Sequence, residues 1–249
     1  MDRFEDLGRR AEALLPATSP IYAQADSGAL EAVGTGIFFI HHDGHFVLSA
    51  THVLRRMRDE RLLIGDTHLV PLNGRFFTAP NDDIDLGFVA LNDEQFEAVR
   101  GARFLSADDV NVSDRPELDP DGHRFYVVGF RADMNAPDGV PTRVESAGAA
   151  YLAHAAPDEK YREVGMSVEH HLVLAFDRNI LCSETRTVES EDEPEGMSGS
   201  GVWQFTGSAN ADTLVAMVIE QSNARKAIIA TRIRPLLDAL RLYAAGVIG

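Results

Sequence analysis

Cysteine is almost missing from this sequence of 249 residues, in which Cys182 is the only one. A single thiol cannot form an internal disulfide, so the chain is not a small secreted domain stapled by disulfides. No stretch approaches the roughly 18 consecutive apolar residues that a transmembrane helix requires. The first ten residues, MDRFEDLGRR, include acids and lack a following apolar run, unlike a secretory signal. These features predict a cytoplasmic protein with no membrane partner.

Basic residues are also scarce, with 23 Lys plus Arg against 39 Asp plus Glu and a formal net charge of −16. Phosphate binding depends on clustered Lys and Arg, so we expect no nucleic-acid partner. A basic peptide or a basic protein surface would be attracted, although the acid could equally serve solubility alone. The apolar fraction of 45% is ordinary for a globular protein, and the chain is long enough for one large domain or two small ones.

Helices are expected only near the two ends of the chain. Apolar residues at helical spacing predict one helix over 4–15 and another over 233–244, where Pro235 falls in the first turn and is tolerated. Between them, short runs rich in Val, Ile, Leu and Phe alternate with Gly, Asp and Asn, a pattern typical of strands. The expected strands are 35–41, 45–50, 61–64, 68–72, 85–91, 124–130, 143–153, 170–176, 200–205, 213–221 and 226–231.

A break in this pattern divides the chain. Residues 107–123 are acidic, contain two prolines and lack apolar periodicity, so they predict a connection between two halves. Many short strands with few helices favour an all-β protein of two barrels, although periodicity alone does not separate this from one long sandwich. We expect an N-terminal helical extension (1–20), an N-terminal β-barrel (21–115) and a C-terminal β-barrel with the terminal helix (116–249).

Three segments carry residues suited to catalysis. The first combines a glycine-rich strand start, 34–39 (GTGIFF), with a histidine at the end of the next run, 48–54 (LSATHVL). The second, 85–91 (DLGFVAL), places an acid before an apolar strand, and the third, 196–202 (GMSGSGV), places serines in a glycine-rich turn. A serine hydroxyl is a weak nucleophile, so it needs an imidazole to take its proton and a carboxylate to orient that imidazole.

In the order His, Asp, Ser these segments resemble the sequence blocks of the trypsin-like, chymotrypsin-fold serine proteases. The nearest in character are disulfide-free bacterial members such as the HtrA proteases, whose blocks read T-A-x-H-V, D-[IL]-[AG] and G-x-S-G-[GS]. The resemblance covers most of the chain from residue 30 onward. It implies two six-stranded antiparallel β-barrels, the first carrying His and Asp and the second carrying Ser.

The resemblance also implies the roles of individual residues. His52, Asp85 and Ser198 would form the catalytic triad. The backbone N–H groups of Gly196 and Ser198 would form the oxyanion hole. The expected activity is that of a serine endopeptidase, which hydrolyses peptide bonds in protein or peptide substrates through an acyl-enzyme and uses no cofactor and no metal.

Two of these assignments have rivals in the sequence. Asp82 and Asp83 lie close to Asp85, but the small residue two positions after Asp85 and the apolar pair that follows favour Asp85. Ser200 lies two residues after Ser198, at a position that the family usually fills with glycine. Ser198 is therefore favoured as the nucleophile.

The substrate pocket is less clearly marked. In trypsin-like enzymes its floor lies six positions before the nucleophile, which is Asp192 here, and an acid there would pair with Arg or Lys of the substrate. The alternative is a solvated acidic loop over 189–195 (ESEDEPE). On the opposite wall we expect Val218 and Gln221. Glu220 and Gln221 depart from the family pattern, which could narrow the pocket or add polar contacts.

Other features bear on metals and on regulation. The adjacent histidines at 41–42 and at 170–171 do not predict a metal site, because neighbours in a strand face opposite sides. Ile21 is the only weak match to the start of an activated chain, so activation by a zymogen cut is not favoured. A cytoplasmic protease that is always active would endanger its host. We therefore expect control by narrow specificity or by a regulatory protein partner.

Two other function classes remain in view. One is a catalytically silent binding module of the same fold, which the complete set of three residues disfavours. The other is a lipase, whose histidine would follow its serine in the chain. No histidine follows Ser198, which excludes that order.

Overall fold

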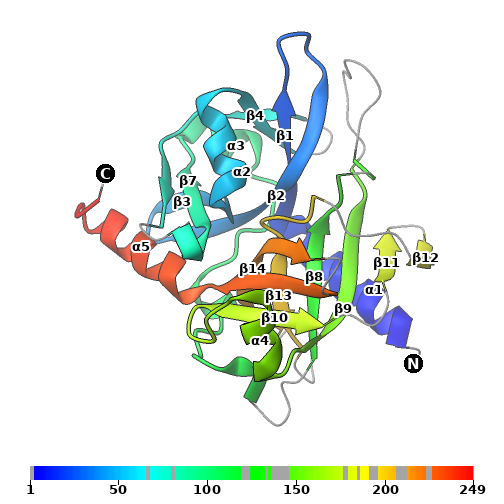
Figure 1. Cartoon of the computed structure of the whole chain (residues 1–249). Helices are drawn as coiled ribbons and strands as arrows, with labels where there is room; N and C mark the ends of the chain where they lie inside the picture. The colour runs from blue at the N-terminus through cyan, green and yellow to red at the C-terminus, as the bar shows by residue number, and fades with distance from the viewer. Residues whose placement is uncertain are drawn as a thin grey trace.

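The protein, seen in a computed structural model, is mostly β, with two sheets of antiparallel strands and helices at their periphery (Figure 1). Among the residues that are described, no helix has both the length and the apolar character needed to cross a bilayer. The described residues are 3–65, 68–79, 82–118, 124–132, 134–135, 146–175, 179–183, 186–190, 196–205, 212–222 and 226–248.

Seven strands from the first half of the chain form one sheet. They are β1 (Thr18–Gln24), β2 (Leu30–His41), β3 (Gly44–Ala50), β4 (Arg61–Ile64), β5 (Val70–Leu72), β6 (Phe76–Thr78) and β7 (Leu86–Ala90). Their order across the sheet is β5-β4-β1-β2-β3-β7-β6. The two edge strands, β5 and β6, are joined by residues 73–75 alone. Such a link spans at most about 14 Å, so the sheet must curl until its two edges are near each other.

This first sheet differs from the closed six-stranded barrel expected there. It has seven strands, and in the described residues no hydrogen-bonded ladder joins β5 to β6. Pro71, the middle residue of β5, has no N–H to donate. Its carbonyl accepts the side-chain amide of Gln95 at 2.6 Å. Because Pro71 offers neither a donor nor a free carbonyl, the first half is an open, curled sheet rather than a closed barrel.

Six strands from the second half do form a closed barrel, which confirms that part of the expected fold. They are β8 (Arg124–Phe130), β9 (Gly148–Ala155), β10 (His171–Ala175), β13 (Gly201–Gln204), β14 (Thr213–Ser222) and β15 (Ala227–Arg232). Around the barrel they run β10-β15-β14-β13-β8-β9, each pair antiparallel. A separate hairpin of β11 (Asn179–Ser183) and β12 (Arg186–Ser190) lies beside β9 (Figure 1). The domain boundaries expected from the sequence stay a prediction.

Alternating side chains of the barrel strands belong to two apolar clusters. Phe125 and Val127 of β8 join a cluster to which all six barrel strands contribute and no helix does, so this cluster fills the barrel. Tyr126 and Val128 join a second cluster that includes strands of the first sheet and helices from both ends of the chain. This second cluster is the core that the two halves share.

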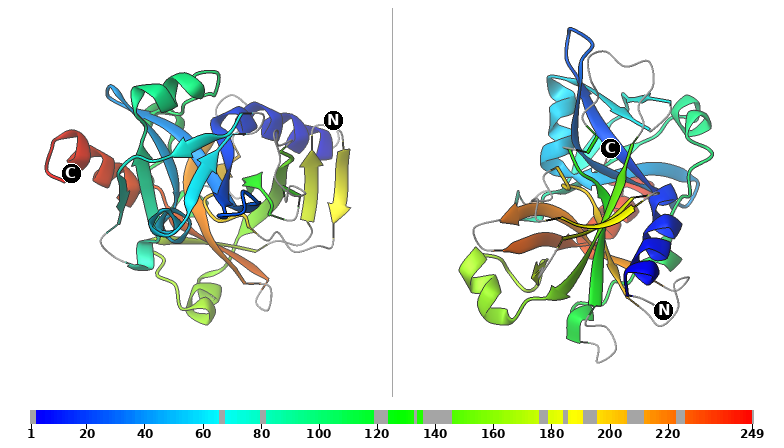
Figure 2. Two further views of the ribbon diagram at one scale, coloured as in Figure 1. Left: turned by 90° about the horizontal axis from the view of Figure 1, so that it is seen from above. Right: turned by 90° about the vertical axis from the view of Figure 1, so that its right-hand side faces the viewer.

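The two helices expected at the chain ends are present as α1 (Arg3–Leu14) and α5 (Arg234–Ala244). They lie at opposite ends of the molecule (Figure 2). A buried ion pair binds α1 to the segment before β14, because Arg10 Nη1 lies 2.5 Å from Asp212 Oδ2. The hydroxyl of Tyr126 donates to the same oxygen, and burial together with this bond raises the pKa of Tyr126.

Three short helices were not predicted. They are α2 (Thr51–Arg55), α3 (Asp93–Ala98) and α4 (Asp158–Val164). The first of them carries a residue of the candidate site.

Candidate active site

The short helix α2 places His52. It starts as soon as β3 ends at Ala50, and its residues Val53 and Leu54 are buried inside the first sheet. A helix turns by about 100° per residue, so burying these two side chains leaves the one before them outside. The His52 side chain is 47% exposed. The apolar side chains Val53 and Leu54 thus anchor the helix in the first sheet, and the imidazole of His52 faces solvent.

Asp85 lies in the turn between the 3-10 helix η3 (Asp82–Ile84) and β7. Its Oδ2 lies 2.6 Å from His52 Nδ1, and its Oδ1 accepts the backbone N–H of His52 at 3.0 Å. Its backbone carbonyl accepts the N–H of Thr51 at 2.9 Å. Three hydrogen bonds to two adjacent residues therefore fix Asp85 against α2. Asp85 is also the acid that the sequence spacing favoured.

This pair sets the position of a proton on the imidazole. A carboxylate only accepts hydrogen bonds, so Nδ1 of His52 carries the hydrogen that faces Asp85. In the neutral ring Nε2 is then an acceptor. Such a ring can take a proton from a hydroxyl, and the carboxylate stabilises the cation that results.

A tight turn holds Ser198. The N–H of Ser200 donates to the carbonyl of Met197 at 2.9 Å, and Gly199 has a φ of +88°. A positive φ at the third position is the mark of a type II turn, which favours glycine there. A Cβ on Gly199 would lie only 2.0 Å from the carbonyl oxygen of Thr35. The turn that presents Ser198 therefore requires glycine for its conformation and for space.

The structure separates Ser198 from its rival. Ser200 is fully buried, and its hydroxyl donates to Thr35 Oγ1 at 3.1 Å. Ser198 is half-buried. A fully buried hydroxyl that already has an acceptor cannot reach a substrate, so Ser198 is the better candidate for a nucleophile.

Two residues of β2 bring the turn of Met197 to Ser200, here called the serine turn, close to α2. The N–H of Thr35 donates to the carbonyl of Ser198 at 2.8 Å. A Cβ on Gly34 would lie 2.8 Å from that same carbonyl oxygen and 2.9 Å from Cγ2 of Val53, the residue after His52. Within the described residues the His52 ring and the Ser198 hydroxyl make no hydrogen bond. Catalytic hydrogen bonds are often long before substrate binds.

Thr35 is a residue that the sequence did not single out. Its carbonyl accepts the Ser49 hydroxyl at 2.7 Å, and its Oγ1 accepts the N–H of Phe130 at 2.9 Å. With its bonds to the backbone of Ser198 and the side chain of Ser200, it ties the first sheet to the barrel at the serine turn. The sequence feature that could have pointed to Thr35 is its position between Gly34 and Gly36.

The expected oxyanion-hole donors lie in this turn, for Ser198, and directly before it, for Gly196. Gly196 has a φ of +77° and precedes Ser198 by two residues. In the part of the chain that the structure describes, neither the Gly196 nor the Ser198 N–H donates a hydrogen bond.

The residues expected to contact substrate are only partly described. Val218 is 2% exposed, and its backbone carbonyl and N–H pair with the Gly199 N–H at 2.7 Å and the Ser200 carbonyl at 2.9 Å. Gln221 is half-buried near the end of β14. Asp192 lies outside the described residues, as does the side chain of Cys182. The binding roles of Val218, Gln221 and Asp192 stay predictions.

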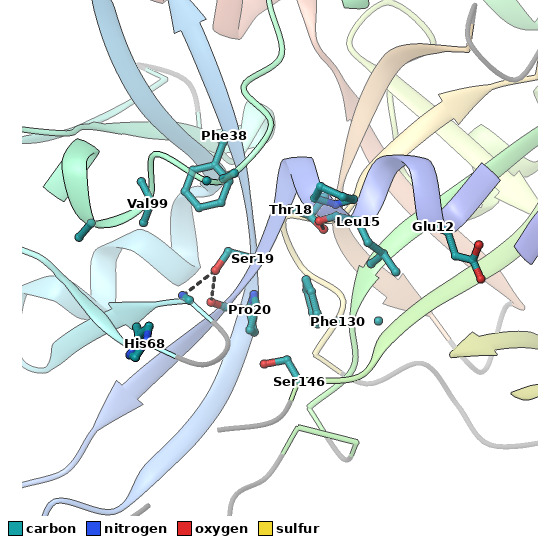
Figure 3. A pocket seen from close by; sticks show the side chains of 16 residues that line it. Glu12, Leu15, Thr18, Ser19, Pro20, Phe38, His68, Val99, Phe130 and Ser146 are labelled. Carbon is teal, nitrogen blue, oxygen red and sulfur yellow. Dashed lines mark hydrogen bonds between the residues drawn. The ribbon is translucent and has the colours of Figure 1, made fainter. Parts of the chain in front are cut away.

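A cavity of about 650 Å³ lies elsewhere, and its lining does not include His52, Asp85 or Ser198 (Figure 3). Its wall includes Leu15, Thr18, Ser19, Phe38, Val99 and Phe130. The Ser19 hydroxyl accepts the Gly65 N–H at 2.7 Å and donates to the Pro20 carbonyl. Among the described residues, the one histidine of this wall, His68, makes no hydrogen bond with a hydroxyl. The candidate active site is therefore defined by the His52–Asp85 pair and the serine turn, not by this cavity.

In the described ranges, no three His, Cys, Asp or Glu side chains gather closely enough to hold a metal ion. No protein-family model and no curated protein matches this sequence. The observed fold, mostly β with one closed barrel and one curled sheet, is compatible with a chymotrypsin-like fold.

Proposed function

We propose that this protein is a trypsin-like serine endopeptidase, with Ser198 as nucleophile, His52 as general base and Asp85 as the group that orients His52. The observation that carries the proposal is the His52–Asp85 pair, with Nδ1 and Oδ2 2.6 Å apart. Two further observations support it: the Ser198 turn is anchored beside α2, and the curled sheet with the closed barrel is compatible with that fold.

The first half of the proposed reaction forms an acyl-enzyme. The Ser198 hydroxyl oxygen attacks the carbonyl carbon of the peptide bond while His52 Nε2 takes the hydroxyl proton. The N–H groups of Gly196 and Ser198 stabilise the oxygen anion that develops, and such donors each contribute about 3 kcal/mol to the transition state. His52 then protonates the leaving amine, the C–N bond breaks, and an ester on Ser198 remains.

The second half releases the acid product. A water molecule attacks the ester carbon and gives its proton to His52. The C–O bond to Ser198 breaks, and His52 returns the proton to the serine. Asp85 stays a carboxylate throughout and stabilises the imidazolium in both halves.

The substrate is a protein or a peptide. A preference for cutting after Arg or Lys rests on Asp192, and the net charge of −16 favours basic substrates in general. Control by narrow specificity or by a regulatory protein, and the cytoplasmic location, rest on the sequence and stay predictions.

Fluorophosphonate labelling of the purified protein tests the proposal, because the probe reacts with a serine only where a base and an oxyanion hole are assembled. We expect labelling of the wild type and of Ser200→Ala, and none of Ser198→Ala. An unlabelled, folded wild type would favour a silent binding module of the same fold. Labelling that survives in Ser198→Ala would refute the assigned nucleophile.

A further inference from the structure

A buried histidine outside the proposed triad lies close to the candidate site. His171 is the first residue of β10 in the closed barrel and is 2% exposed. Its ring nitrogen Nε2 lies 2.8 Å from the backbone carbonyl of Asp83, 88 residues away in the first half of the chain. The bond therefore links the closed barrel to the turn that precedes Asp85.

The donor in this bond is the histidine. A carbonyl oxygen only accepts, so Nε2 must carry a hydrogen. The other ring nitrogen lies 3.1 Å from the carbonyl of Ser167, which already accepts the backbone N–H of His171 at 3.0 Å. The Ser167 carbonyl is thus held by the His171 backbone as well as by its ring. The bond to the Asp83 carbonyl, by contrast, depends on the ring nitrogen Nε2.

The turn that His171 holds is conformationally demanding. Asp85 has a φ of +28°, which is unfavourable for a residue with a side chain and persists only where its surroundings enforce it. After Asp85, the carbonyl of Leu86 accepts the N–H of Ala79 at 2.9 Å and holds the start of β7. Before Asp85, Ile84 packs on the core shared by the two halves, and His171 holds the carbonyl of Asp83.

We propose that His171 is a positioning residue: it holds the turn 82–84 from the closed barrel, so that Asp85 keeps its orientation towards His52. This inference rests on the proposed function, because it assigns His171 to the same site. It follows that docking of the barrel on the first sheet helps to set the geometry of the acid and base, which both belong to the first sheet.

Three variants of His171 separate the donor from the volume of the ring. In His171→Gln the side-chain amide reaches about as far as Nε2 and keeps a donor. In His171→Phe the ring volume is kept and the donor is lost. In His171→Asn the donor stops short of Asp83. The matched control is His170→Phe, the same change at the adjacent, half-buried histidine, which makes no bond to the turn 82–84 among the described residues.

Fluorophosphonate labelling at increasing probe concentration gives a limiting rate and a half-saturating concentration. We expect His171→Phe to lower the limiting rate roughly tenfold, equivalent to about 1.4 kcal/mol, without changing the half-saturating concentration. His171→Gln should restore most of the rate, and His170→Phe should match the wild type. A wild-type limiting rate in His171→Phe, or an equally slow His171→Gln, would overturn the positioning role. If His171→Phe does not fold, the limiting rates of His171→Gln and His171→Asn are compared instead. A faster His171→Gln supports the positioning role, and equal rates overturn it.

A second measurement does not depend on activity. In protein carrying ¹⁵N-histidine, the Nδ1 signal of His52, identified by its loss in His52→Ala, reports the bond to Asp85. We expect His171→Phe to shift this signal and His171→Gln to return it to the wild-type position. An unshifted signal in His171→Phe would contradict the inference even where labelling is absent. An unlabelled wild type with the expected shifts would refute the proposed function and leave the positioning role supported.

Discussion

The two halves of the molecule hold their parts of the candidate site by different means. In the open first sheet, side chains make the decisive contacts: both carboxylate oxygens of Asp85 bond to His52, through its ring and its backbone N–H. In the closed barrel, the backbone does so: the turn of Met197 to Ser200 closes on itself, and Gly199 N–H bonds to the carbonyl of Val218 at 2.7 Å. Among the described residues, the Ser198 side chain makes no hydrogen bond that would help to place it.

This difference predicts where each half is sensitive to substitution. Side-chain changes in the first half should alter chemistry with little effect on folding, because Asp85 and His52 are both partly exposed. Backbone changes in the second half should alter folding as well, because the serine turn is packed against Thr35 and Ser49.

The largest expected effect is that of Asp85→Asn. An amide turned towards His52 Nδ1 favours the tautomer with its proton on Nε2, where a base is needed, so the labelling rate should fall about 10⁴-fold. Thermal unfolding should change little. Asp59→Asn, at an exposed carboxyl soon after α2, is the matched control and should label at the wild-type rate. A fully active Asp85→Asn variant would show that the side-chain bonds of Asp85 do not govern the chemistry of His52.

Gly199→Ala tests how far the stability of the second half depends on the backbone of the serine turn. The added methyl would lie 2.0 Å from the Thr35 carbonyl oxygen at a φ that disfavours side chains, so we expect a loss of roughly 4 kcal/mol in unfolding free energy. Urea denaturation measures it. Gly101→Ala, where a Cβ would meet nothing within 4 Å, should stay within about 0.5 kcal/mol of the wild type. Equal stability of the two variants would mean that the turn is built differently.

Glu117→Gln tests whether the stability of the barrel also depends on a side-chain ion pair. Both oxygens of Glu117, in the 3-10 helix η5 (Pro116–Leu118), accept from Arg232 of β15, at 2.8 and 3.1 Å, and both side chains are buried. Glu117→Gln removes the negative charge that faces the buried Arg232 and leaves its guanidinium with neutral acceptors such as the Val168 carbonyl. We therefore expect a loss of about 3 kcal/mol at neutral pH. The exposed pair of Glu97 and Arg100 supplies the control, because Glu97→Gln should cost less than about 1 kcal/mol.

The same pair has a pH signature. Burial opposes the charge on Glu117, but the hydrogen bonds from Arg232, from the backbone and from Arg115, together with the positive charge of Arg232, outweigh it and lower the pKa below the ordinary 4.5. The stabilisation is therefore complete above pH 4.5 and is lost as the pH falls through the lower pKa of the folded state. Thermal unfolding at several acidic pH values should show this loss in the wild type and a smaller one in Glu117→Gln. Identical acid profiles would contradict the assigned pairing.

The smallest expected effect is that of Ser200→Ala, and its comparison with Ser198→Ala distinguishes the two serines. Ser200→Ala removes one hydrogen bond to Thr35 and should cost about 1 kcal/mol of unfolding free energy while labelling persists. Ser198→Ala should do the reverse, with stability retained and labelling lost. Lost labelling in Ser200→Ala at unchanged stability would mean that Ser200, not Ser198, is the nucleophile.

The pattern of short apolar runs bounded by Gly, Asp and Asn predicted strands such as β3, β8 and β14. It missed β1, where Pro20 argues against a strand. The structure tolerates Pro20 because β4 pairs with β1 only from Ile21 onward, so the missing N–H of Pro20 deprives no strand on that side. It also missed α2, because a five-residue helix is too short to show a period.

The sequence placed His52, Asp85 and Ser198 through short local motifs, and the structure adds the contacts that local motifs cannot contain. Thr35 meets Ser200 across 165 residues, and His171 meets Asp83 across 88. Neither residue stands out by type or by spacing. The open edge between β5 and β6 likewise follows from Pro71 meeting the side chain of Gln95, 24 residues later.

In the proposed site, His52 Nε2 and the N–H groups of Gly196 and Ser198 surround the Ser198 hydroxyl. A crystal structure of the protein after reaction with a fluorophosphonate tests this arrangement. We expect phosphorus bound to Ser198 Oγ, its free oxygen about 2.7–3.1 Å from the N–H groups of Gly196 and Ser198, and His52 Nε2 facing Oγ. Phosphorus on another residue, or on Ser198 with its oxygen turned away from these N–H groups, would refute the proposed site.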